Sequence, residues 1–188
     1  MININSKVSD FEAEVYQNGD IKKIKFSKYK GKWIVLIFYP ADFTYVCPTE
    51  LEDAQTLYKE FKKFGAEIIS VSTDTAFAHK AWHDSSPAIS KVQYPMMADP
   101  TGQISRMFGV YIEEEGMALR GTFIIDPNGL LKTMEIHNND VGRSAKESLR
   151  KLQAAKFVYE HPGGNVCPAN WEPGKKALRK DLKLVGKI

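Results

Sequence analysis

Along this chain, unbroken runs of apolar residues alternate with segments in which apolar residues recur at the spacing of a helix. Residues 33–39 (WIVLIFY) are rich in β-branched and aromatic side chains, which predicts a strand buried on both faces. Apolar residues then recur every three or four positions from Leu51 to Phe64, and Gly65 follows them, so a helix is expected there. Residues 66–72 (AEIISVS) predict a second buried strand. These elements predict two parallel strands joined by a right-handed crossover.

The rest of the sequence continues this alternation. Before residue 110 we expect a helix over 75–83, a strand over 95–98 and a short helix that ends near Gly109. Near the C-terminus we expect a helix over 144–159. Residues 122–126 and 130–137 flank Pro127-Asn128-Gly129, and Asn-Gly accepts the positive φ angles of a tight turn, so a hairpin is predicted. The whole pattern predicts an α/β fold with a mixed central β-sheet flanked by helices, with function at the carboxyl ends of the strands.

Length and composition restrict the class of protein. The 188 residues are 43% hydrophobic and 26% charged, which is typical of one globular domain. We expect that domain over residues 1–160, followed by a C-terminal tail over 161–188 that is not an independent domain. The net charge of +3 does not favour nucleic acid or a membrane as a partner. The N-terminal sequence lacks the apolar segment of an export signal, and no run approaches the ~18 apolar residues of a membrane span. A cytoplasmic location is therefore expected.

Cys47 is the first candidate for chemistry. It follows the strand 33–39 at the start of a helix, where Pro48 is well tolerated and the unpaired N–H groups favour a thiolate. A pKa lowered by about 2.5 units gives about 30-fold more thiolate but about 10-fold lower nucleophilicity. Neighbouring groups must therefore supply most of any rate. The alternative is an inert buried thiol. The one other cysteine, Cys167, lies in the Pro/Gly-rich tail.

Four residues are candidates for completing a site around that thiol: Thr44, Glu50, Arg120 and Arg143. Thr44 is three residues upstream of Cys47, so its hydroxyl can bond to the sulfur or to an incoming oxygen. The charged residues can position an electrophile and stabilise developing charge. Sequence spacing alone does not place them near Cys47.

Motifs across nearly the whole chain resemble one family. The pattern Pro40-x-x-x-Thr44-x-x-Cys47 matches the active-site motif of peroxiredoxins. Residues 38–51 (FYPADFTYVCPTEL) resemble typical 2-Cys peroxiredoxins of the type that serves as the peroxidase component of bacterial alkyl hydroperoxide reductase. The similarity continues in segments 71–83, 99–110, 113–127, 141–154 and 161–171. It implies a thioredoxin-like fold for residues 1–160.

The resemblance also implies roles for the two cysteines. Cys47 matches the peroxidatic cysteine, whose thiolate attacks the O–O bond and becomes a sulfenic acid. Cys167 matches the resolving cysteine, which condenses with that sulfenic acid to a disulfide, usually with the other subunit of a dimer. This chemistry needs no metal or organic cofactor.

The other matching residues would shape the pocket. Thr44 corresponds to the hydroxyl that orients the peroxide, and Pro40 to the residue that shields the site. Arg120 corresponds to the arginine that polarises the peroxide and holds the thiolate. Glu50 and Arg143 correspond to the supporting ion network around that arginine.

The resemblance implies an antioxidant thiol peroxidase that reduces hydrogen peroxide and organic hydroperoxides. A dithiol donor would re-reduce it: the flavoprotein subunit of the alkyl hydroperoxide system, or in second place thioredoxin. No phosphate-binding or dinucleotide-binding glycine motif is present, so electrons from NADH or NADPH would arrive through that partner. A homodimer, and a decameric ring of five dimers, would be the assembly. Two alternatives stay open: a general disulfide exchanger, and a chaperone-like assembly controlled by its cysteines.

Aromatic and histidine residues near the motif admit simpler interpretations. His79 and His83 are four residues apart and could form half of a zinc site, but no third ligand is evident, so a surface or packing role is favoured. Trp82 is expected in the core. Phe43 and Tyr45 are candidates for an apolar rim that helps dimers associate, with core packing as the alternative.

Overall fold

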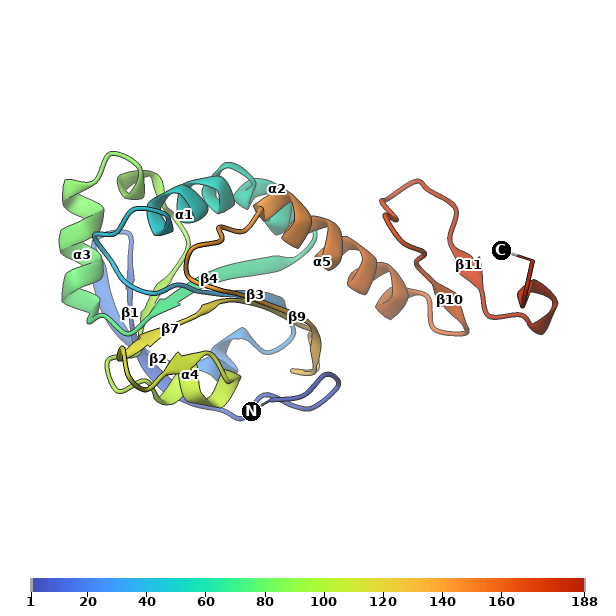
Figure 1. Ribbon diagram of the computed structural model, residues 1–188, viewed down its shortest axis with the longest axis horizontal. Coiled ribbons are helices and arrows are strands. Elements are labelled where there is room, and N and C mark those ends of the chain that lie inside the picture. Colours follow the sequence, from blue (N-terminus) through green and yellow to red (C-terminus); the bar gives the residue numbers. More distant parts are fainter. Residues whose placement is uncertain (1, 188) are drawn as a thin grey trace.

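The computed structural model describes residues 2–187, and its centre is one mixed seven-stranded sheet (Figure 1). The strand order is β2-β1-β5-β4-β3-β8-β9. Their bounds are β1 Glu12–Gln17, β2 Asp20–Lys25, β3 Trp33–Phe38, β4 Ala66–Ser72, β5 Met96–Ala98, β8 Arg120–Ile125 and β9 Leu131–His137. Strands β3, β4 and β5 are parallel, and the other neighbours are antiparallel. The predicted mixed α/β sheet is therefore confirmed.

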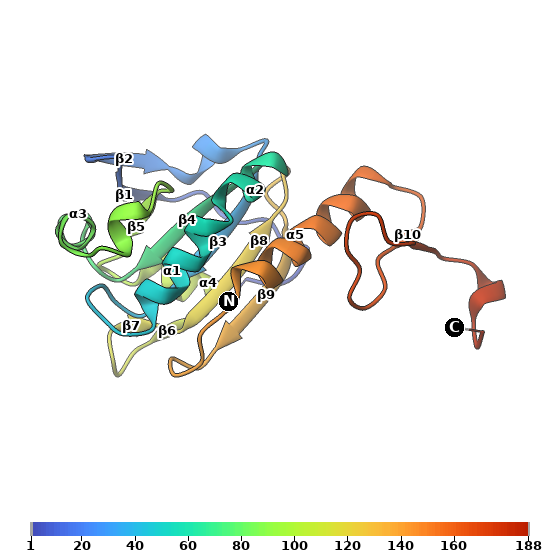
Figure 2. The ribbon, with the colours of Figure 1, turned by 90° about the horizontal axis from the view of Figure 1, so that it is seen from above.

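Five α-helices accompany the sheet within the described chain. They are α1 Cys47–Thr56, α2 Tyr58–Lys63, α3 Ala76–Ser85, α4 Gln103–Phe108 and α5 Ala145–Glu160. Short 3-10 helices cover Phe26–Tyr29, Ile89–Lys91 and Leu182–Leu184. Helices α1, α2 and α5 lie over the same face of the sheet, as the view from above shows (Figure 2).

The central parallel pair has the register that the buried runs suggest. Trp33 pairs with Ala66 and Phe38 with Val71, and every residue of both strands is buried. The helix between them begins at Cys47, the helix start that the sequence predicts for this cysteine, and Pro48 fits its first turn. It differs from the expected single helix that continues to Phe64. It is interrupted at Leu57, whose φ of −98° and ψ of 1° are not helical.

Two hairpins were not predicted. Strands β1 and β2 form the first, with Asn18 and Gly19 at positive φ angles of 52° and 83° in its turn. The second is a small pair outside the main sheet, β6 Tyr111–Ile112 and β7 Met117–Ala118. The predicted hairpin around Pro127-Asn128-Gly129 is present as β8 and β9.

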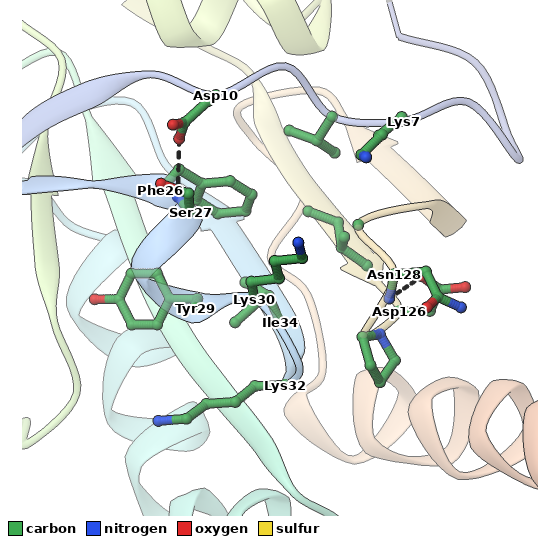
Figure 3. A pocket seen from close by; sticks show the side chains of 14 residues that line it. Lys7, Asp10, Phe26, Ser27, Tyr29, Lys30, Lys32, Ile34, Asp126 and Asn128 are labelled. Atoms are coloured by element: carbon green, nitrogen blue, oxygen red, sulfur yellow. Dashed lines mark hydrogen bonds between the residues drawn. The ribbon is translucent and has the colours of Figure 1, made fainter.

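A cavity of about 260 Å³ opens at the amino end of β3 (Figure 3). Its lining combines the buried side chains of Phe26 and Ile34 with three lysines, Lys7, Lys30 and Lys32. Two carboxylates at its edge, Asp10 and Asp126, accept hydrogen bonds from backbone N–H groups and so fix the local loops. No thiol or histidine lines this cavity. It therefore does not contain the thiol on which the sequence motif centres.

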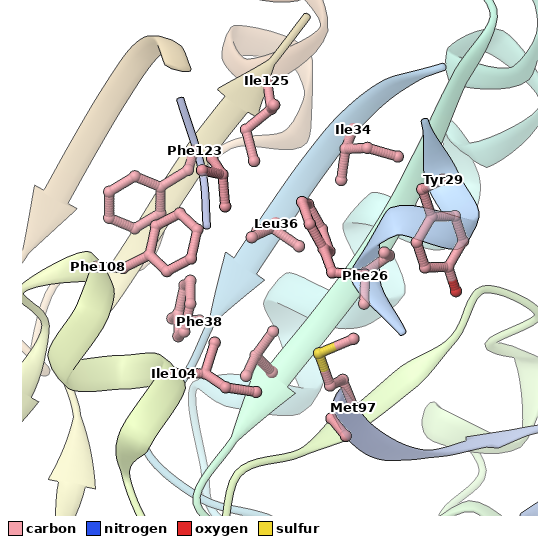
Figure 4. Close-up of a cluster of buried hydrophobic side chains, with 14 of the residues drawn as sticks. Phe26, Tyr29, Ile34, Leu36, Phe38, Met97, Ile104, Phe108, Phe123 and Ile125 are labelled. Carbon is pink, nitrogen blue, oxygen red and sulfur yellow. The ribbon is translucent and has the colours of Figure 1, made fainter. Parts of the chain in front are cut away.

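Alternation along β3 divides the interior into two cores. Ile34, Leu36 and Phe38 point into a core shared with α4 and the N-terminal segment. Three rings meet there, with Phe38, Phe108 and Phe123 at centroid separations of 4.8–5.5 Å (Figure 4). The residues between them along β3 point to the other core, beneath α1, α2 and α5. Burial on both faces holds β3 rigidly and fixes the loop that follows it.

The C-terminal tail extends beyond α5, well clear of α1 in both views (Figures 1 and 2). Its secondary structure is slight: β10 Asn165–Val166 pairs with β11 Leu178–Arg179. Trp171 anchors it, with its ring 4.7 Å from that of Phe157 on α5. Among the described residues, no helix is long and apolar enough to cross a bilayer.

Candidate active site

Cys47 lies at the start of the helix that follows the central strand β3, a position that favours an anion. The buried strand β3 ends at Phe38, a loop follows, and Cys47 is the first residue of α1. Its side chain is 0% exposed, yet it lines a cleft of about 420 Å³. The free N–H groups of the first helical turn favour negative charge there. Structure and sequence therefore agree on a thiol at a strand-to-helix corner.

Arg120 lies against the sulfur. It comes from β8, the antiparallel neighbour of β3. Its Nη1 atom donates to Sγ of Cys47 at 3.3 Å and to Oε2 of Glu50 at 2.6 Å, and its Nε donates to the backbone oxygen of Asn139 at 2.9 Å. The guanidinium is thus held from three sides with one N–H directed at the thiol. A fixed cation at this position stabilises a thiolate.

Glu50 joins Arg120 to Arg143. Both the backbone N–H and Nε of Arg143 donate to Oε1 of Glu50 at 2.8 Å, and Nη2 donates to Oε2 at 3.0 Å. All three side chains are only 4% exposed. Burial opposes the charge of Glu50, but the hydrogen bonds and charge of Arg143 lower its pKa below the usual value. Burial likewise opposes the charge of Arg120, but its bond to Cys47 and the charge of Glu50 raise its pKa. The network stays ionised at neutral pH.

Thr44 and Pro40 line the same cleft, as the motif predicts. The Thr44 hydroxyl does not bond to the sulfur, however, because it donates to the backbone oxygen of Ala41 at 2.9 Å. With its proton committed, this oxygen keeps lone pairs that can accept a hydrogen bond. Of the two contacts considered for Thr44, the one with the sulfur is absent, and the one with an incoming oxygen stays a prediction.

A buried polar cluster fixes the loop between β3 and Cys47, and the sequence did not reveal it. The Tyr39 hydroxyl donates to Oδ1 of Asp42 at 2.7 Å, and Nδ1 of His79 lies 2.8 Å from Oδ2. The Asp42 N–H donates to Asp74 at 2.8 Å. Phe43, the next residue, has a positive φ of 56°, which this anchoring helps to maintain. A carboxylate in an otherwise apolar loop was the available signal.

His79 is therefore a buried partner of Asp42, 0% exposed, and the expected packing role is confirmed. His83 lies beside the Tyr16 hydroxyl instead. Within residues 2–187, no group of three or more His, Cys, Asp or Glu side chains is placed to hold a metal ion. Trp82 is buried as predicted. Phe43 and Tyr45 are 60% and 94% exposed, so the core-packing alternative for them is wrong.

Cys167 is not brought to the site. It follows β10, and its Sγ lies 3.7 Å from the backbone oxygen of Ala154 in the middle of α5. Both cysteines are free thiols. Burial against the helix raises the pKa of the Cys167 thiol, so it is protonated at neutral pH. The folded chain thus separates a thiol that is hydrogen-bonded to a cation from one whose hydrogen-bond partner is a carbonyl oxygen.

Sequence models of two families match the chain. The AhpC/TSA family model matches residues 4–134, and the model for the C-terminal domain of 1-Cys peroxiredoxin matches residues 154–187. Alkyl hydroperoxide reductase C of Pseudomonas aeruginosa is 52% identical over 185 residues, 98% of each chain, and that of Bacillus subtilis is 51% identical over the same length. The chain belongs to the AhpC/TSA family. The predicted resemblance to peroxiredoxins is confirmed, and with it the enzyme class, a thiol-dependent peroxidase.

Solved peroxiredoxin structures have the same fold. The crystal structure of Enterococcus faecalis AhpC is 47% identical, covers 89% of this chain and 100% of its own, and superposes with a TM-score of 0.86. Reduced Plasmodium vivax 2-Cys peroxiredoxin is 30% identical, with coverages of 93% and 91% and a TM-score of 0.88. These likenesses confirm the predicted thioredoxin-like fold. Membership in this peroxiredoxin family implies a peroxide substrate and a reductase partner.

Proposed function

We propose that Cys47 is the peroxidatic cysteine of an enzyme that reduces hydrogen peroxide and organic hydroperoxides in antioxidant defence. The observation that carries this assignment is the 3.3 Å contact from Nη1 of Arg120 to Sγ of Cys47 at the base of an open cleft. A thiol with that neighbour at a helix start has a fixed cation to stabilise its thiolate form, and it lines a space into which a peroxide fits.

The reaction uses the groups that converge on the cleft. The Cys47 thiolate attacks the terminal oxygen of the hydroperoxide, so an S–O bond forms as the O–O bond breaks. The sulfur is oxidised to a sulfenic acid, and the departing alkoxide takes a proton and leaves as an alcohol, or as water from hydrogen peroxide. Arg120 stabilises the negative charge that moves from sulfur to oxygen, and Thr44 accepts a hydrogen bond from the peroxide O–H. Pro40 shields the sulfur from bulk water.

Glu50 and Arg143 position Arg120 without touching the peroxide. Four hydrogen bonds between these two residues and Arg120 hold the carboxylate and, through it, the guanidinium. A preformed arrangement of this kind costs no reorganisation when charge develops.

Cys167 resolves the sulfenic acid in our proposal. Its thiol attacks the Cys47 sulfur, forming an S–S bond and releasing water. A disulfide requires Cα atoms about 5.5 Å apart. Ala154, beside Cys167, is nine residues along α5 from Ala145, about 14 Å by helical rise. Ala145 in turn donates its N–H to Asp53 of α1. The tail of the same subunit thus lies away from Cys47, which favours an intersubunit disulfide or a large movement of residues 161–188, a tail rather than a domain.

The same separation argues against a general disulfide exchanger, which needs two accessible thiols close together. A dithiol donor would reduce the disulfide: the flavoprotein subunit of the alkyl hydroperoxide system, or otherwise thioredoxin. We place the enzyme in the cytoplasm, because two cysteines are too few for the disulfide framework of a small exported domain.

We infer that the chain is a homodimer that assembles further into a ring of five dimers. The exposed Met134 and Ile136 on the edge strand β9 support an interface between two subunits there. Phe43 and Tyr45 in the active-site loop, and Phe77 on α3, are also exposed and support contacts between dimers. Sedimentation of the reduced protein at several concentrations tests both steps.

Disulfide mapping tests the proposed reaction cycle. After one equivalent of hydrogen peroxide, non-reducing electrophoresis and peptide mass spectrometry should show a Cys47–Cys167 disulfide. Mixing Cys47→Ser with Cys167→Ser subunits, one of them isotope-labelled, should give a cross-linked pair only if the bond joins two subunits. The absence of any Cys47–Cys167 peptide from the wild type would contradict the assignment of Cys167.

A further inference from the structure

One wall of the cleft above Cys47 takes no part in the reaction proposed above. It is the hairpin β6–β7, which contributes apolar side chains from Ile112 and Met117, with Leu119 directly after it. Two carboxylates lie on the same lining, Glu115 in the hairpin turn and Asp140 in the loop after β9. Any hydroperoxide larger than hydrogen peroxide must place its organic group among these side chains.

The hairpin is a firm wall. The ring of Tyr111 packs directly on Gly102, where an added Cβ atom would lie 2.4 Å from the ring. The guanidinium of Arg106 stacks 3.9 Å from the centre of the same ring. Arg106 also binds both oxygens of Glu113, at 2.6 and 2.7 Å. These contacts fasten the hairpin to α4, so its position does not depend on a substrate.

The carboxylates on the cleft are uncompensated. Glu113 is neutralised by Arg106, but within residues 2–187 neither Glu115 nor Asp140 has a lysine, arginine or histidine nitrogen within 4.0 Å. The cleft lining contains no lysine, and the charge of Arg120 is already shared with Glu50. A substrate therefore passes two free negative charges before it reaches the one cation.

We propose that this mouth makes the enzyme selective for neutral, apolar hydroperoxides over anionic ones. Glu115 and Asp140 are the specificity-determining residues for charge, and Met117 and Ile112 contact the organic group. The proposal rests on the peroxidase assignment of Cys47 and adds the substrate class that the cleft accepts. Alkyl groups gain by burial against the hairpin, whereas a carboxylate on the substrate is repelled.

The expected size of the charge effect follows from the exposed position of both groups. A unit charge at several ångströms in a largely aqueous medium changes an association rate by roughly two- to threefold, and salt weakens the effect. Two carboxylates together should therefore disfavour a monoanionic substrate by roughly four- to ninefold at low salt.

A matched pair of tertiary hydroperoxides tests this. 2-Methyl-2-butyl hydroperoxide is neutral, and 3-hydroperoxy-3-methylbutanoate replaces one of its methyl groups with a carboxylate. The measured quantity is the ratio of their second-order rates with reduced enzyme, by stopped-flow tryptophan fluorescence, at low and high salt. The ratio of neutral to anionic rate should be largest at low salt, and it should fall in Glu115→Gln, in Asp140→Asn and most in the double variant.

Glu114→Gln is the control, because Glu114 belongs to the same hairpin turn but does not line the cleft. It should leave the ratio unchanged. Met117→Ala tests the apolar wall and should slow the neutral tertiary hydroperoxide more than hydrogen peroxide. Comparing variants with the wild type cancels the different intrinsic reactivity of the two substrates.

The outcomes separate this proposal from the one on which it rests. If the wild type reacts rapidly with hydrogen peroxide but the double variant keeps the wild-type ratio at low salt, the charge selection is overturned and the peroxidase assignment stands. A wild type that fails to react with hydrogen peroxide overturns the peroxidase assignment, and with it this proposal. If the ratio of neutral to anionic rate falls as much in Glu114→Gln as in Glu115→Gln or Asp140→Asn, the net charge of the protein sets the selection rather than the mouth of the cleft. That result would overturn the proposal too.

Discussion

Cys47 and Cys167 have the same side chain in opposite surroundings. Cys47 begins a helix behind a strand buried on both faces, with Arg120 3.3 Å from its sulfur. Cys167 lies in a tail with little secondary structure, and its one polar contact among the described residues is a carbonyl oxygen at 3.7 Å. Both thiols are at least partly buried, but of the two only Cys47 accepts a hydrogen bond from a cation. In the proposed cycle, these neighbours determine that Cys47 reacts first, and Cys167 needs freedom to move more than it needs activation.

Removal of Arg120 should have the largest effect on the difference in reactivity between Cys47 and Cys167. Arg120→Met deletes the charge that stabilises both the thiolate and the departing oxygen in the proposed reaction, so the rate of Cys47 with hydrogen peroxide should fall by about 10²–10³. Stopped-flow kinetics measures it, with circular dichroism to verify folding. Arg179→Met, an exposed arginine in the tail, should retain the wild-type rate. A loss of less than tenfold in Arg120→Met would place the activation of Cys47 elsewhere.

Glu50→Gln should lower the stability of the Cys47 region next most strongly. It leaves Arg120 and Arg143 buried without their carboxylate, which typically costs about 3–5 kcal/mol. Glu52→Gln is the matched control on the same helix, because its pair with Lys91 is exposed and worth at most about 1 kcal/mol. Urea unfolding at neutral pH compares the two variants, and equal losses would show that the buried network is not special.

The stability difference between wild type and Glu50→Gln should depend on pH in one direction. The pKa of Glu50 is lowered in the folded protein, so its contribution is fully present above the ordinary value of 4.5 and is lost as pH falls through the folded value. The stability difference between wild type and Glu50→Gln should therefore shrink in acid. A difference that stayed constant down to acid unfolding would contradict the ionised network.

Trp171→Ala should have the smallest effect, confined to the tail. It removes the ring that packs on Phe157, so residues 161–188 should become more sensitive to protease while the rate of Cys47 with peroxide is retained. Leu182→Ala is the control, because Leu182 is exposed in the same tail. A slower Cys47 in Trp171→Ala would show that the tail supports the first site after all.

The central strands of the fold and the position of the Cys47 site could be predicted from the sequence. The runs of apolar residues at β3 and β4 predicted the central strands because both faces are buried, and the motif from Pro40 to Cys47 marked the site. The hairpin β1–β2 was missed although Asn18-Gly19 carries its turn signal, since half of its strand positions are exposed and charged. Short, half-buried strands give weak patterns.

The contacts in the site between residues far apart in the sequence could not be predicted from the spacing of residues along the chain. Arg120 is 73 residues from Cys47, and Arg143 is 93 residues from Glu50. Only the pairing of β8 with β3 and the return of the chain before α5 bring them together. The bond between His79 and Asp42 was missed for the same reason, because a pattern along the chain does not record a contact across 37 residues.

Stopped-flow measurement of hydrogen peroxide with three reduced proteins tests the central claim most directly. Wild type and Cys167→Ser should react equally fast in the first step, because Cys47 and Arg120 are intact in both. Cys47→Ser should lose that step entirely, and Cys167→Ser should stop at the sulfenic acid without forming the Cys47–Cys167 disulfide. Rapid peroxide consumption by Cys47→Ser would contradict the account.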